Sequence, residues 1–121
     1  MTNTLIYKGF HGNVCFSPDD QCLFGEIIGI TDTITYTAES AADIRKQFEE
    51  AVDYYIEVCK DIGKKPLKSY SGSLNVRIGQ EMHLKAAIKA QTEGISLNKF
   101  IKKALEKEVD KLSLPPEKSL E

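Results

Sequence analysis

Residues 73–78, SLNVRI, alternate polar and apolar side chains without exception, and they decide the fold of the second half of the chain. This period of two predicts a β-strand whose apolar side chains share one face. The surrounding segment, residues 73–112, has no second strand pattern with which this strand could pair locally. An unpaired strand leaves a row of backbone N–H and C=O groups open. We therefore expect two copies of the chain to pair these strands antiparallel about a two-fold axis, unless the strand joins a sheet of the first half.

Two helical patterns follow the predicted strand. The first runs from about Gln80 to Thr92 and ends at Gly94, and the second begins after Ser96, a favourable N-cap residue. Residues 73–112 number only 40, and a domain of that size is seldom stable alone. In the predicted intertwined dimer, four helices cover the apolar side of the two-stranded ribbon. The expected dimer core consists of Leu74, Val76, Ile78, Leu97, Phe100, Ile101 and Leu105.

The polar side of such a ribbon would face away from the helices. A two-stranded ribbon fits the DNA major groove, where Arg can bind guanine, Asn can bind adenine, and Ser can contact several groups. The predicted base-reading residues are Ser73, Asn75 and Arg77. The first turn of the second helix offers free backbone N–H groups that can hold a phosphate. The predicted phosphate-contacting residues are Ser96, Leu97, Asn98 and Lys99, with more general attraction from Lys85, Lys89, Lys102 and Lys103.

The first half of the chain predicts a small sheet and one helix. Short β-prone runs occur at residues 5–7, 14–16, 23–30 and 33–37, and the last alternates so that Ile34 and Tyr36 face a core. Ser40 opens a helix over roughly residues 41–62, with an apolar stripe at helical spacing. The stripe consists of Ile44, Phe48, Val52, Tyr55 and Cys59. The fold class expected here is α+β, with a small antiparallel sheet of about three strands covered by one helix.

The boundary between the halves coincides with a change in charge. Residues 63–72, GKKPLKSYSG, have the composition of a linker. Residues 1–62 carry 4 Lys/Arg and 11 Asp/Glu, a net charge of −7, whereas residues 63–121 carry 12 and 7, a net charge of +5. We expect domains at 1–63 and 73–112, a linker at 64–72 and a disordered tail at 113–121. The charges favour an acidic module for a cationic partner and a basic module for a polyanion, or else two surfaces that merely differ.

Composition excludes several classes of protein. The 121 residues are 41% apolar and 28% charged, which is typical of a globular chain. No apolar run approaches the ~18 residues that a membrane span requires, and the N-terminus has no secretory-signal pattern. Three cysteines are an odd number, so we expect reduced thiols and a cytoplasmic location.

Residues 73–112 resemble the ribbon–helix–helix family of DNA-binding proteins. The resemblance rests on the strand SLNVRI, on GISLNKFI at residues 94–101, and on Ala104-Leu105. Gly79 stands where many members have Pro, which relaxes the start of the first helix without affecting the ribbon.

About residues 5–112 resemble HicB-type antitoxins of type II toxin–antitoxin systems. The matching stretches are GFHG at 9–12, FGEI at 24–27, ITY at 34–36, FEEAVDYY at 48–55 and YSG at 70–72. The resemblance implies a first domain with a truncated RNase H-like fold that binds and neutralises a HicA-type ribonuclease toxin. It also implies operator DNA as a partner, repression of the chain's own operon, and a homodimer or a dimer of dimers. The alternative is a stand-alone ribbon–helix–helix repressor whose first domain senses a ligand or metal.

An RNase H-like fold raises the possibility of a metal-dependent nuclease. The candidate carboxylates are Glu26, Glu49, Glu50 and Asp53, but the strands supply only one of them, so we interpret them as acidic surface. His11, Cys15 and Cys22 match no common zinc spacing. We expect Cys15 and Cys59 to be core residues and His83 to be a surface or interface residue. Tyr54 and Tyr55 are expected to be packing residues, or one of them to lie at a partner interface. The chain is thus predicted to have no catalytic residue, metal or cofactor.

Overall fold

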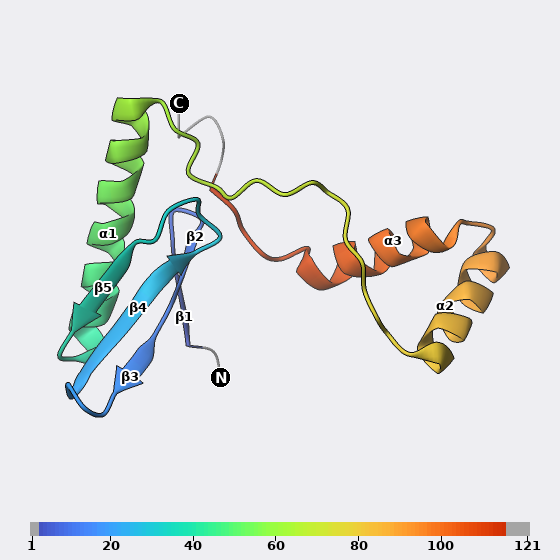
Figure 1. Ribbon diagram of the computed structural model, residues 1–121, viewed down its shortest axis with the longest axis horizontal. Coiled ribbons are helices and arrows are strands. Elements are labelled where there is room, and N and C mark those ends of the chain that lie inside the picture. Colours follow the sequence, from blue (N-terminus) through green and yellow to red (C-terminus); the bar gives the residue numbers. More distant parts are fainter. Residues whose placement is uncertain (1–2, 116–121) are drawn as a thin grey trace. The chain divides into compact units, whose positions relative to one another are not determined.

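The computed structural model describes residues 3–115, and these residues form two compact units. The first unit extends to Tyr70 and also includes residues 113–115, while the second comprises Ser71–Leu112. The first unit contains an antiparallel sheet and helix α1 (Ala41–Ile62), and the second contains helices α2 (Gln80–Glu93) and α3 (Leu97–Val109) (Figure 1). The predicted α+β class is confirmed.

The sheet of the first unit has five strands, whereas the sequence pattern indicated about three. They are β1 (Thr4–Tyr7), β2 (Phe10–Asn13), β3 (Cys15–Ser17), β4 (Cys22–Ile28) and β5 (Thr35–Ala38). All pairs are antiparallel, and β4 is central. Strands β2 and β3 share one edge of β4, β5 occupies the other, and β1 extends the sheet beyond β2. As β5 lies at the margin of the sheet, its second edge is free within residues 3–115.

A tight hairpin that the sequence pattern did not reveal joins β1 to β2. Tyr7 pairs with Phe10, so only Lys8 and Gly9 form the loop, and both have positive φ, at 52° and 82°. Two consecutive positive φ values define the two-residue turn whose twist matches a β-hairpin. Lysine is an uncommon residue in this conformation, so the Lys-Gly pair gave no clear turn signal.

Helix α1 has the bounds that its caps and apolar stripe predict. The Ser40 hydroxyl accepts a hydrogen bond from the Asp43 N–H at 3.1 Å and so caps the first turn. At the other end, the N–H groups of Gly63 and Lys64 bind the carbonyls of Lys60 and Cys59. This pair of bonds is the Schellman arrangement, which satisfies carbonyls that a helix end leaves open.

The core of the first unit lies between α1 and one face of the sheet. Phe48 is fully buried and its ring lies 5.5 Å from that of Tyr36, in a tilted arrangement. The prediction that Tyr36 faces the core is confirmed, and Ile34 is half-buried beside it. The buried apolar residues are Phe10, Ile27, Ile30, Tyr36, Ile44, Phe48, Val52, Tyr55 and Cys59.

Residues 64–68 belong to the first unit, although they were predicted to lie in the linker. The Thr31 N–H donates to the Pro66 carbonyl and the Lys68 N–H to the Gly29 carbonyl, each at 2.9 Å. Leu67 forms an isolated β-bridge with Ile30. These bonds hold the segment against residues 29–31, which shortens the free connection to residues 69–72. Composition could not predict this because the partner groups lie more than 30 residues earlier.

Residues 113–115 also differ from the prediction, which placed them in a disordered tail. The Ser113 carbonyl lies 2.6 Å from Nε2 of His11, and the backbone of Leu114 and Pro115 lies against Gly9. His11 and Pro115 are both buried. The remainder of the predicted tail, residues 116–121, lies outside the described residues.

The second unit consists of α2 and α3, joined by a tight turn at Gly94. The N–H groups of Gly94 and Ile95 bind the carbonyls of Gln91 and Ala90, another Schellman arrangement. Ser96 caps α3 through a 3.1 Å hydrogen bond from the Lys99 N–H. The predicted positions of both helices are confirmed, and α3 ends at Val109. The described residues 73–78 form no strand, because no second strand lies beside them.

Candidate functional site

The candidate nucleic-acid interface lies in the second unit, on the extended segment 73–78. Gly72 and Gly79 bound this segment. The Ser73 backbone bonds to the Ser71 hydroxyl, but within the described chain no hydrogen bond joins the backbone of residues 74–78 to another part. Because open backbone groups favour pairing, the segment is available as a strand for a second chain.

The three predicted base-reading residues, Ser73, Asn75 and Arg77, are all exposed on this segment. They alternate with Leu74, Val76 and Ile78, of which Leu74 is 74% and Val76 62% exposed. Large apolar side chains at such exposure are unfavourable in water. Since both alternating sets are exposed, the described chain covers neither face of the segment.

The rest of the predicted dimer core is also incompletely covered. Leu97 and Phe100 are half-buried, whereas Ile101 and Leu105 are exposed. Among the described residues of the second unit, Ala90 is the one buried apolar side chain. The unit therefore lacks a core of its own, and most of its large apolar side chains are exposed.

The predicted phosphate-contacting residues lie together in the first turn of α3. The Ser96 hydroxyl accepts the hydrogen bond from the Lys99 N–H, and its carbonyl accepts one from Phe100 N–H. Ser96 is therefore engaged as a cap, whereas Leu97 and Asn98 supply N–H groups of the first turn, which have no partner within the helix. Asn98 and Lys99 are exposed, so both can approach an anion.

The basic character of the second unit is weaker than the sequence halves indicated. Residues 71–112 carry 8 Lys/Arg and 5 Asp/Glu, a net charge of +3. Lys64, Lys65 and Lys68 belong to the first unit, where residues 3–70 carry 7 Lys/Arg and 11 Asp/Glu, a net charge of −4. Lys85 and Lys103 form exposed ion pairs with Glu81 at 3.3 Å and Glu93 at 3.8 Å, which contribute little to stability. The first unit is still acidic and the second still basic, but their net charges differ by less than those of the two halves of the sequence.

The carboxylates considered for nuclease chemistry do not converge. Gly25 and Ile27 face α1, so Glu26 between them points to the opposite side of the sheet. Asp53 on α1 is engaged by Lys8 at 2.8 Å and by the Tyr7 hydroxyl at 3.1 Å. The hydrogen bond between Lys8 and Asp53 raises the pKa of Lys8. Within residues 3–115, no group of three or more His, Cys, Asp or Glu side chains is arranged to hold a metal ion.

The thiols and histidines take different positions from one another. Cys59 is buried as predicted, but Cys15 is exposed, so the prediction of a core position for Cys15 is wrong. Cys15 lies on the short strand β3, in which no residue is buried. His83 is exposed as expected. Tyr55 packs in the core, whereas Tyr54 is 65% exposed on the flank of α1. The packing prediction is therefore wrong for Tyr54, and its alternative position at a partner interface stays a prediction.

A polar network fixes the end of α1 to the loop after β4. Lys64 Nζ lies 2.6 Å from Asp32 Oδ2, and the Tyr55 hydroxyl donates to the same oxygen at 3.0 Å. The hydrogen bonds from Lys64 and then Tyr55 lower the pKa of Asp32. Burial raises the pKa of Tyr55. Burial also raises the pKa of Tyr36 to about 12, so both phenols are neutral donors at physiological pH.

The structure also contains an open hollow between β5 and α1, which the sequence analysis did not predict. Its volume is about 520 Å³, and it is lined by residues 33–37 together with Gln47, Glu50, Ala51 and Tyr54. The exposed aromatic Tyr54 at helical spacing from Glu50 was the one available sign, because the apolar stripe of α1 does not include it.

Residues 55–105 match the HicB family. The matched segment begins in the last turns of α1 and ends within α3, so it includes the free connection, the extended segment and α2. This HicB match supports a HicB-type protein. No curated protein and no solved structure matches the chain. None of the described helices is both long enough and apolar enough to cross a membrane.

Proposed function

We propose that this chain is the antitoxin of a type II toxin–antitoxin pair, and that it binds and neutralises a HicA-type mRNA-cleaving toxin and represses its own operon. The HicB match over residues 55–105 is the observation that carries the proposal. The acidic first unit suits a toxin that binds RNA, because an RNA-binding surface is cationic.

The second unit supports the DNA-binding half of the proposal through its incompleteness. Residues 73–78 have an unpaired backbone and an uncovered apolar set. Antiparallel pairing with a second copy would satisfy the backbone and place Leu74, Val76 and Ile78 beneath the four helices of a ribbon–helix–helix dimer. Six polar side chains, three from each copy, would then enter the major groove.

Phosphate binding would orient this ribbon on the duplex. In the proposed complex, the first-turn N–H groups of α3 hold a backbone phosphate, and Lys99 adds a positive charge beside it. These contacts give affinity without sequence preference, whereas Arg77 and Asn75 give selectivity. Both copies of the chain contribute, so the operator is expected to be palindromic.

Operator binding is tested with DNA from upstream of the chain's own gene. Arg77→Ala should weaken operator binding by about 1–3 kcal/mol, roughly 5- to 150-fold, and relax the preference over unrelated DNA. Arg45→Ala removes the same charge from α1, in the first unit, and is the matched control. Lys99→Ala should weaken binding to all sequences and reduce the salt dependence. If Arg77→Ala and Arg45→Ala bind equally tightly and selectively, Arg77 does not read bases.

Toxin neutralisation is tested with the small basic protein encoded beside this gene. Coexpression of the full chain should restore growth that the basic protein inhibits, and the two should copurify as a complex. Failure to associate would overturn this half of the proposal. The alternative of a metal-sensing first domain gains no support from residues 3–115, in which no metal-ligand group is found.

A further inference from the structure

Strand β5 carries a free hydrogen-bonding edge in the first unit. The Ile27 N–H donates to the Ile34 carbonyl at 3.0 Å, and Gly25 pairs with Tyr36 in the same register. Because hydrogen-bonded and non-bonded pairs alternate in an antiparallel ladder, residues 34 and 36 direct their backbone groups to β4. Thr35 and Thr37 therefore direct their N–H and C=O groups to the opposite edge, where no strand lies within residues 3–115.

This edge lacks the proline and lysine residues that often block strand addition. Residues 33–37, TITYT, contain neither Pro nor Lys, and the neighbouring side chains include exposed threonines. The hollow of about 520 Å³ lies directly beside the edge, with Gln47, Glu50, Ala51 and Tyr54 of α1 on its far side. An added strand would thus have open backbone groups on one side and space for its side chains on the other.

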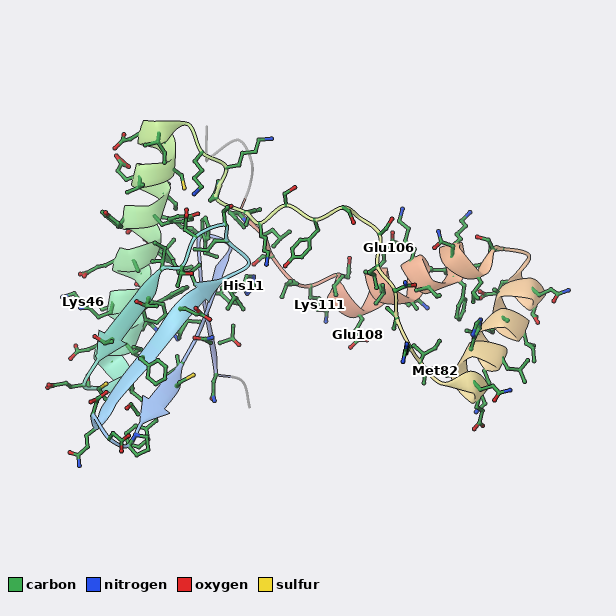
Figure 2. The ribbon with its side chains drawn as sticks, in the orientation of Figure 1. His11, Lys46, Met82, Glu106, Glu108 and Lys111 are labelled. Carbon is green, nitrogen blue, oxygen red and sulfur yellow. The ribbon has the colours of Figure 1, made fainter. Side chains whose placement is uncertain are left out.

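The charges beside the edge indicate what kind of strand fits. Glu50 lines the hollow, and Asp43 and Glu57 lie seven residues before and after it, close to the same flank of α1. Glu39 follows β5 directly. Lys46, labelled in Figure 2, lies one turn before Glu50 as the neighbouring cation. No Lys, Arg or His nitrogen of residues 3–115 lies within 4.0 Å of the Glu50 carboxylate.

The acidic flank disfavours a second copy of this chain at the edge of β5. Two copies paired there would bring their own Glu50 side chains and neighbouring carboxylates together, and like charges across an interface are unfavourable. A strand with basic side chains would instead place a cation beside Glu50 while its backbone bonds to Thr35 and Thr37.

We infer that the toxin docks by adding an extended, lysine- or arginine-bearing segment to the free edge of β5, with a basic side chain in the hollow beside Glu50. This inference rests on the proposed antitoxin function. It assigns toxin binding to residues 33–37 and to the Glu50 flank of α1, a surface separate from the extended segment of the second unit.

The first test measures binding of the full-length chain to a catalytically inactive form of the basic protein encoded beside its gene. The double variant Thr35→Pro/Thr37→Pro removes both outward N–H donors without removing a donor to β4, and should weaken binding roughly tenfold or more. Thr35→Val/Thr37→Val keeps these donors and is the matched control. A normal circular dichroism spectrum and a cooperative thermal unfolding transition like that of the unaltered chain would show that the proline variant is folded.

The second test addresses the charge. Glu50→Arg should weaken binding by about tenfold or more, and Glu50→Gln by less, with a smaller dependence on salt. Glu49→Gln removes a carboxylate from the neighbouring residue, which lies about 100° further around α1, and should leave binding unchanged.

Hydrogen exchange gives a direct readout that needs no variant. The Thr35 and Thr37 amides should exchange rapidly in the free chain and become protected when the toxin is bound, whereas Tyr36 should be protected in both states. If the chain binds the toxin but these two amides stay unprotected, or the proline and Glu50 variants bind normally, the docking site is wrong and the antitoxin function stands. Loss of self-association in the proline variant would assign the edge to a second copy and overturn the inference. If the unaltered chain does not bind the toxin, the proposed function itself fails.

Discussion

The two units of the chain use their apolar residues in opposite ways. The first unit encloses nine buried apolar side chains between α1 and the sheet. The second places two helices, capped at the turn of Gly94 and Ser96 that joins them, beside an unpaired segment and, among its described residues, buries only Ala90. Both have strong local signals such as caps and apolar periodicity. The difference shows that local structure and a closed core are separate properties, and that only the first unit has both.

The largest effect is expected in the closed core. Phe48 is 0% exposed and contacts Tyr36, so Phe48→Ala should lower the free energy of unfolding of the first unit by about 3–5 kcal/mol. Urea denaturation followed by tyrosine fluorescence measures this change. Phe16→Ala, at an exposed position of β3, should change it by less than about 0.5 kcal/mol. Equal effects would contradict the assignment of the core.

The second unit should respond to substitution through its oligomeric state. Val76→Asp places a charge in the proposed dimer core and should raise the dimer dissociation constant by about 100-fold or more. Sedimentation equilibrium measures this constant. Asn75→Asp adds the same charge at the adjacent polar position and should leave the dimer intact. A dimer that is indifferent to Val76→Asp would show that residues 73–78 lie elsewhere in the assembly.

Gly25 in β4 and Gly29 in the loop after it differ in the space available for a side chain. A side-chain carbon at Gly25 would overlap the Asn13 carbonyl oxygen and crowd the Tyr36 ring, so Gly25→Ala should cost about 2 kcal/mol or more. At Gly29 the same carbon meets open space, and only the positive φ of 78° opposes it. Gly29→Ala should therefore cost roughly 1 kcal/mol. Thermal unfolding of the two variants tests the order, and a reversed order would contradict it.

The smallest effect concerns acid stability. The pKa of Asp32 is lowered in the folded state by Lys64 and Tyr55, so its contribution is present above its unfolded pKa of about 4 and is lost as the pH falls through the lower folded pKa. Asp32→Asn should reduce the acid-induced loss of stability in this range. Melting temperatures measured from pH 2 to 7 test this, with Asp19→Asn, in the loop after β3, as the control.

The sequence predicted α1 and the two later helices well because their signals are local. Caps at Ser40 and Ser96 and the apolar stripe of α1 lie within a few turns of each other. Strand β2 was missed because FHGN lacks alternation and β-branched residues. Its Gly12 is suited to its place only because the Tyr36 hydroxyl and the Phe48 ring, far along the chain, fill the space beside it.

The candidate sites also differ in whether their signals are local or depend on distant parts of the chain. The alternation of residues 73–78 identified the exposed base-reading candidates from six residues of sequence. The hollow beside β5 could not be identified in this way, because it depends on the distance between a strand edge and a helix flank. The hydrogen bonds of residues 64–68 and 113–115 are likewise long-range, and composition alone made both segments look unstructured.

The return of the chain to β2 at Ser113 makes the second unit an insertion within the first rather than a module appended to it. A fragment ending at residue 70 would therefore lose residues 113–115, which lie against His11 and Gly9. To excise the insertion cleanly, residue 70 should be rejoined to residue 113 through a short flexible bridge. The host domain prepared in this way would keep every segment that its own sheet holds.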